Sequence, residues 1–194
     1  MKNTFKYLSA LALAALILVS CGKQQADAQT QNTTQAAAPA VKVFSISDVK
    51  SQGTNKAPDF SWTENGKAVK FSEATKGKVV FLNFWGTWCP PCRAEIPDII
   101  EISNEFASKG LVVIGMANER VAGDEAISKV KEFAASKNIS YTNFISNQEV
   151  RELYGGINFI PQTFIIDKQG NIVETINGMR KKDEFIEIIN KYLK

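Results

Sequence analysis

The residues with the most evident chemistry are Cys89 and Cys92, which two prolines separate in a Cys-Pro-Pro-Cys motif. At positions i and i+3 of a helix, two side chains lie about 5–6 Å apart, close enough for a disulfide. Free N–H groups and the helix dipole stabilise a thiolate at a helix start. The pair therefore predicts a redox disulfide that exchanges with other disulfides, with Cys89 as nucleophile and Cys92 as resolving thiol.

The absence of histidine excludes several other chemistries. It removes Ser–His and Cys–His pairs, and three cysteines cannot form a four-thiolate zinc site. A c-type haem attachment motif needs histidine after its second cysteine, where this chain has Arg93. We expect neither a metal nor a cofactor. The net charge of +3 gives no reason to expect nucleic acid as a partner.

The first 20 residues have the pattern of a lipoprotein signal peptide. Lys2 and Lys6 precede an apolar run over 8–19, which is shorter than the roughly 20 residues that a transmembrane helix needs. The run ends in Leu-Val-Ser-Cys21, which resembles a bacterial lipobox. We therefore expect lipidation of Cys21; an ordinary signal peptide with an incidental cysteine is the alternative.

Residues 21–40 are then the lipidated N-terminus and a flexible tether, because this stretch is rich in Gln, Ala and Thr and has no aromatic residue. The expected location is extracytoplasmic, with the lipoprotein anchored to a membrane and facing the periplasm in a Gram-negative cell. Export also places the remaining two cysteines where disulfides form and persist.

The sequence pattern over 41–194 predicts one domain in which strands and helices alternate. The core of this domain is expected at about 57–194. This pattern indicates an α/β fold with parallel strand pairs and a final antiparallel hairpin. Asn65-Gly66 predicts an earlier hairpin. Strands are expected at 60–62, 67–71, 79–85, 111–116, 140–145, 163–167 and 172–176, and helices from the cysteine motif to 108, from an Asp124 N-cap to 138, at 147–154 and at 182–193.

The segment Phe84-Trp-Gly-Thr-Trp-Cys-Pro-Pro-Cys-Arg-Ala-Glu-Ile-Pro97 resembles the active-site motif of TlpA/ResA-like thiol–disulfide oxidoreductases of the thioredoxin superfamily, and 160–172 resembles their second signature. The resemblance implies a thioredoxin-like fold, with a central mixed sheet flanked by helices, an N-terminal β-hairpin extension and a central insert at about 117–145. It also implies membrane-tethered reduction of exported protein disulfides, often of apocytochrome c. We expect a monomer that takes electrons from a membrane donor.

Four further site residues follow from the resemblance. Pro161 matches the cis-proline that faces the cysteines, and the backbone of Ile160 would pair with an extended substrate peptide. Glu95 matches a glutamate associated with proton handling; its alternative interpretation is a solvated acid in the first helical turn. Trp88 belongs either to the docking surface or to the packing of the domain.

Other interpretations remain open at this stage. Thioredoxin has an aspartate six residues before its first cysteine, where this chain has Asn83, so proton transfer would need Glu95 or water. A peroxiredoxin-like thiol peroxidase normally has Thr or Ser where Gly86 stands, and a non-catalytic thioredoxin-like binding lipoprotein is the third possibility. Glu119-Arg120 and 180–184 are interpreted as solvated charges. The direction of electron flow follows from the resemblance alone.

Overall fold

The structure is a computed structural model that describes residues 41–194. The expected signal peptide, the tether and Cys21 lie outside these residues. The strands are β1 (Val43–Ser45), β2 (Ser47–Lys50), β3 (Asp59–Glu64), β4 (Lys67–Lys70), β5 (Val79–Trp85), β6 (Leu111–Ala117), β7 (Thr142–Ile145), β8 (Gln162–Ile166) and β9 (Ile172–Asn177). The helices are α1 (Phe71–Ala74), α2 (Pro90–Phe106), α3 (Gly123–Ser136), α4 (Gln148–Leu153) and α5 (Lys182–Tyr192), with a 3₁₀ turn at Ala107–Lys109.

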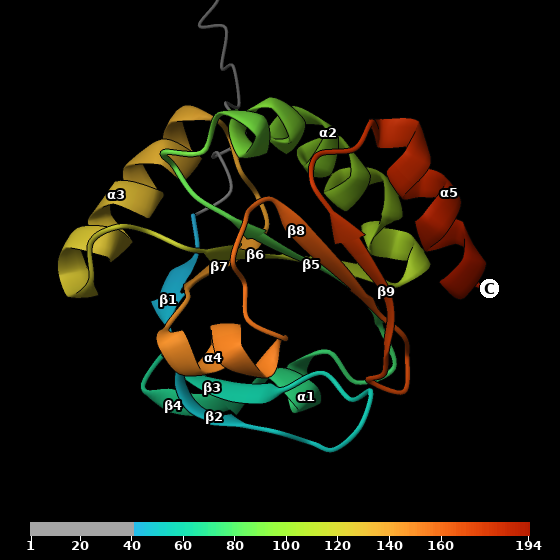
Figure 1. Ribbon diagram of the computed structural model, residues 1–194, viewed down its shortest axis with the longest axis horizontal. Helices are drawn as coiled ribbons and strands as arrows, with labels where there is room; N and C mark the ends of the chain where they lie inside the picture. The colour runs from blue at the N-terminus through green and yellow to red at the C-terminus, as the bar shows by residue number, and fades with distance from the viewer. Residues whose placement is uncertain (1–40) are drawn as a thin grey trace, which may run out of the picture. The chain divides into compact units, whose positions relative to one another are not determined.

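A six-stranded mixed sheet in the order β1-β7-β6-β5-β8-β9 forms the centre of the domain. Helices α2, α3 and α5 cover one face, while α4, α1 and the smaller sheet β2-β3-β4 cover the other (Figure 1). Each face has its own apolar cluster, one with Ile99 and Phe185 and the other with Phe60 and Val150. This is the expected α/β thioredoxin-like fold. Within residues 41–194, none of the helices has both the length and the apolar character needed to span a bilayer.

Strand β5 positions the cysteine motif, because its C-terminal end leads directly into it. All seven residues of β5 are buried, and the strand pairs in parallel with β6 and antiparallel with β8. A central strand covered on both faces explains its near-continuous apolar sequence. At its end, Trp85 donates from Nε1 to Asn143 Oδ1 over 3.0 Å in β7. Gly115 in β6 leaves the space for this bond, since a Cβ there would overlap the Asn143 amide.

The expected hairpin around Asn65-Gly66 is confirmed, with β3 and β4 antiparallel and Glu64 opposite Lys67. The prediction of Asp124 as an N-cap is wrong. Helix α3 begins at Gly123 after an Ala122 N-cap, and Asp124 lies inside the first turn, where a carboxylate still interacts favourably with the helix dipole. Strands β1 and β2 were not predicted; β1 pairs in parallel with β7, about a hundred residues later in the chain.

Candidate active site

The cysteine motif forms the start of helix α2, at the carboxyl end of β5 (Figure 1). Cys89 is the N-cap residue, and Pro90 and Pro91 occupy the first two helical positions, where a missing N–H is harmless. The backbone N–H of Cys92 donates to Cys89 Sγ over 3.3 Å. The two sulfurs form a disulfide, with Cα atoms 5.3 Å apart. The predicted placement of Cys89 at the helix start is thus confirmed.

The sheet brings the Ile160-Pro161 segment, which precedes β8, next to Cys89. The Sγ atom of Cys89 lies 3.7 Å from the carbonyl oxygen of Ile160. The peptide bond between Ile160 and Pro161 is cis, as the resemblance implied. Cys89 is 2% exposed and Cys92 is completely buried, so both sulfurs lie beneath a rim of neighbouring residues.

That rim carries exposed apolar side chains. Trp88 is 36% exposed, Phe159 52% and Met179 48%. Phe159 directly precedes Ile160, and the loop that leads to Met179 is joined to Pro161 by a hydrogen bond from Gly178 N, 2.9 Å long. Large apolar side chains exposed together mark an interaction surface. Sequence reasoning missed Phe159 and Met179; the signal for Phe159 was its place beside the Ile-Pro pair.

Glu95 is buried beneath this site, one helical turn after Cys92. The residue is 1% exposed, so the interpretation as a solvated acid is wrong. Its Oε1 accepts a 3.0 Å hydrogen bond from Asn83 Nδ2, and its Oε2 has no hydrogen-bond partner among the described residues. Burial raises the pKa of Glu95 from 4.5 to about 7, although the bond from Asn83 opposes the shift. A carboxyl group that titrates near neutrality can exchange protons with a thiol.

Asn83 holds the carboxyl group in place. Its Nδ2 donates both to Glu95 and, over 2.9 Å, to Thr163 Oγ1 in β8. All three side chains are buried. An amide nitrogen only donates, so Asn83 orients the carboxylate but cannot take its proton. The sequence indicated that, with an amide at position 83, proton transfer would need Glu95 or water. It did not indicate that Thr163 contacts Asn83.

The loop before Cys89 is fixed by Glu119, which follows β6. The Glu119 side chain is fully shielded from solvent. Its carboxylate accepts from Thr87 N over 2.7 Å and from Thr87 Oγ1 over 2.9 Å. The interpretation of Glu119 as a solvated charge is therefore wrong. Charge-assisted bonds to a backbone N–H and a hydroxyl are strong enough to hold a loop in one conformation.

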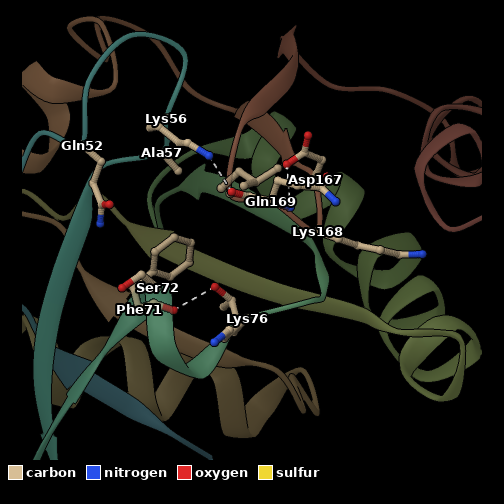
Figure 2. Close-up of a pocket in the computed structure, with 12 residues that line it drawn as sticks. Gln52, Lys56, Ala57, Phe71, Ser72, Lys76, Asp167, Lys168 and Gln169 are labelled. Atoms are coloured by element: carbon tan, nitrogen blue, oxygen red, sulfur yellow. Dashed lines mark hydrogen bonds between the residues drawn. The ribbon is translucent and has the colours of Figure 1, made fainter.

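One pocket among the described residues lies away from the cysteines. It has a volume of about 150 Å³ and is lined by Lys56, Phe71 and the turn at 167–170 (Figure 2). Ile166 in its wall pairs with Val80, so the pocket lies near the amino end of β5, opposite the cysteine motif. Two residues of the pocket wall are joined, because Lys56 Nζ donates to Gln169 O over 2.7 Å. No cluster suited to a metal ion occurs within 41–194.

Comparisons with known proteins agree with this geometry. The family described as Redoxin matches residues 52–191. The chain is 35% identical over 138 residues to thiol-disulfide oxidoreductase ResA of Bacillus thuringiensis subsp. konkukian (strain 97-27), covering 70% of this chain and 76% of that protein. It is 31% identical over 150 residues to ResA of Bacillus subtilis (strain 168), covering 76% and 79%. A crystal structure of a thiol:disulfide interchange protein from Chlorobium tepidum TLS has a TM-score of 0.63 and 33% identity, covering 74% of this chain and 99% of that one.

Proposed function

Since this chain belongs to the Redoxin family and is a thiol–disulfide oxidoreductase of the ResA type, we propose that it is an exported, membrane-tethered reductase. Its substrates would be disulfides of exported proteins, with apocytochrome c as one candidate. The observation that carries the proposal is the placement of Cys89, at a helix start and with its Sγ 3.7 Å from the carbonyl oxygen of Ile160, while Cys92 is completely buried.

The reaction would begin with the reduced pair. The thiolate of Cys89 attacks one sulfur of a substrate disulfide, and the other substrate sulfur leaves as a thiolate. Cys92 then loses its proton and attacks Cys89 Sγ, which releases the second substrate thiolate and forms the Cys89–Cys92 disulfide. Two electrons pass to the substrate, and a membrane electron donor would reduce the pair again. The Cys92 N–H, 3.3 Å from Cys89 Sγ, is placed to stabilise the Cys89 thiolate.

Glu95 is the proposed acceptor of the Cys92 proton. Its position three residues after Cys92 puts both side chains on one face of α2. Its Oε2, the oxygen that Asn83 does not bond, would receive the proton directly or through one water molecule. Asn83 keeps the carboxyl group oriented during this transfer.

Substrate would dock along Ile160 and Pro161, with Trp88 on the other side of the cysteines. An extended peptide beside Ile160 would bring its own disulfide within reach of Cys89 and pair with the Ile160 backbone. The exposed side chains of Phe159 and Met179 add apolar contact area on the same side.

The test is to trap the mixed disulfide. In the full chain with Cys92→Ser, resolution is blocked, so we expect covalent adducts between Cys89 and exported proteins that mass spectrometry identifies. Cys89→Ser serves as the matched control and should give none. The absence of adducts, together with no reduction of a model protein disulfide by the parent, would contradict the proposal. Peroxide consumption faster than disulfide exchange would favour a thiol peroxidase instead.

The proposed anchor needs its own experiment, because Cys21 lies outside the described residues. Its support is the lipobox-like sequence that ends at Cys21 and the polar stretch that follows. Cys21→Ser should move the protein from the membrane fraction to the soluble fraction of the exporting cell. Continued membrane association of Cys21→Ser, with the same electrophoretic mobility as the parent, would contradict lipidation.

A further inference from the structure

The segment after β6 carries a positive charge to the rim of the active site. Arg120 is exposed, and its guanidinium carbon lies 4.1 Å from the centre of the Trp88 ring. Trp88 itself donates from Nε1 to Asn118 O over 2.9 Å, which fixes the plane of the indole. Because Glu119 between them is bonded to Thr87, the whole segment is held against the loop that ends at Cys89. The Arg120 guanidinium therefore lies against the ring of the residue that directly precedes Cys89.

A groove of about 440 Å³ begins at this arginine. Its walls come from the ends of β1 and β7, the segment that follows β6 and the start of α4, and they include Arg120 and Arg151. These parallel strands end at the sheet edge where β5 leads into the cysteine motif. The groove and the cysteines thus open on the same edge, the usual location of binding sites in such sheets.

The groove is suited to carboxylates. Within 41–194, no acidic side chain forms an ion pair with Arg120 or Arg151. Arg151 Nη1 donates to Ser146 Oγ over 3.2 Å, which orients its guanidinium. Glu119 is the one acidic residue in the wall, and Thr87 and Lys129 already engage its carboxylate. Guanidinium groups bind carboxylates through paired hydrogen bonds, so two arginines without acidic partners favour an anionic occupant.

We propose that this groove binds an acidic segment of the protein substrate that flanks the disulfide being reduced. The inference rests on the proposed function and names the substrate class of the same site. One part of the substrate would lie beside Ile160, while its acidic part would pass over Trp88 and place carboxylates on Arg120 and Arg151. Arg93, which is exposed and lines a pocket together with Thr87 of the same loop, adds positive charge on the approach.

The test uses the reduced full chain in a neutral detergent and two peptides that contain the same disulfide. One peptide has three glutamates beside the disulfide, and its partner has three glutamines. We expect the second-order rate constant for reduction to be about fivefold higher for the glutamate peptide, the effect of two exposed ion pairs together. In Arg120→Gln/Arg151→Gln this ratio should fall to about one, whereas Lys67→Gln/Lys76→Gln, with equal charge loss at other exposed positions, should keep it.

A measurement on the parent alone keeps the proposal open to refutation if the arginine variant does not fold. In about 1 M salt, where the Debye length is about 3 Å, the preference for the glutamate peptide should disappear. Equal rates for both peptides at low salt, or a preference that survives in the arginine variant, would overturn the groove assignment. Failure of the parent to reduce a small uncharged disulfide would instead contradict the reductase function, so the two failures are distinguishable.

Discussion

Replacing Glu95 with glutamine tests the buried carboxyl group, because the two side chains have nearly the same shape and differ in charge. Burial raises the pKa of Glu95 from 4.5 to about 7 in the folded protein. Between these values the folded protein binds more protons than the unfolded chain, so the free energy of unfolding falls as the pH rises. At about 1.36 kcal/mol for each pKa unit, the loss amounts to about 3 kcal/mol above pH 7 and vanishes well below pH 4.5.

We therefore expect the free energy of unfolding of Glu95→Gln, relative to the parent, to rise by about 3 kcal/mol between about pH 4.5 and 8.5. The cost of burying an unpaired amide is the same at every pH and cancels in this comparison. The assay is urea unfolding of the oxidised proteins, in which neither cysteine of the disulfide titrates. Glu132→Gln on the exposed face of α3 is the matched control for removing one carboxylate. A pH-independent difference for Glu95→Gln would refute the reasoning.

Three smaller predictions test the supporting residues. Gly115→Ala should lower the urea midpoint with a loss of about 2–3 kcal/mol, because its methyl group would displace the Asn143 amide; an unchanged midpoint would contradict this. Gly86→Ala places a carbon 2.9 Å from Trp88 Nε1, so indole fluorescence should shift and reduction of a protein disulfide should slow. Unchanged fluorescence and an unchanged rate would show that the loop tolerates the methyl group. Asn83→Leu removes a donor that lowers the pKa of the buried carboxyl group, so stopped-flow pH profiles of exchange should move upward; a downward shift would count against it.

The sequence predicted those parts of the site that depend on neighbours in the chain. The apolar run of β5 and the prolines after Cys89 are local signals, and both gave the correct element and the correct helix start. The Ile-Pro pair was placed opposite the cysteines through the family resemblance. Local patterns were sufficient for the two cysteines because one strand, one loop and one helical turn, all consecutive in the chain, position them.

The missed features depend on partners far apart in the chain. Glu119 looked like a surface charge because its partner, Thr87, is 32 positions away. Thr163 lies 80 positions from Asn83, and no periodicity links two buried polar residues on different strands. Strand β1 was missed for the same reason, since three residues form a strand only because β7 offers an edge. Contacts of this kind are decided by the packing of the whole sheet.

In the proposed cycle, Asn83 and Glu95 together would do the work of the buried aspartate that thioredoxin has at the position of Asn83. An ordinary thiol has a pKa of about 8.5, so transferring its proton to a carboxylate with a pKa of 4.5 would cost about 5 kcal/mol. With the pKa of Glu95 raised to about 7, the same transfer costs about 2 kcal/mol. Asn83 keeps the acceptor in position but, as an amide, does not compete for the proton. In the proposed cycle, the burial that costs the fold stability would thus also make Glu95 a usable base for Cys92.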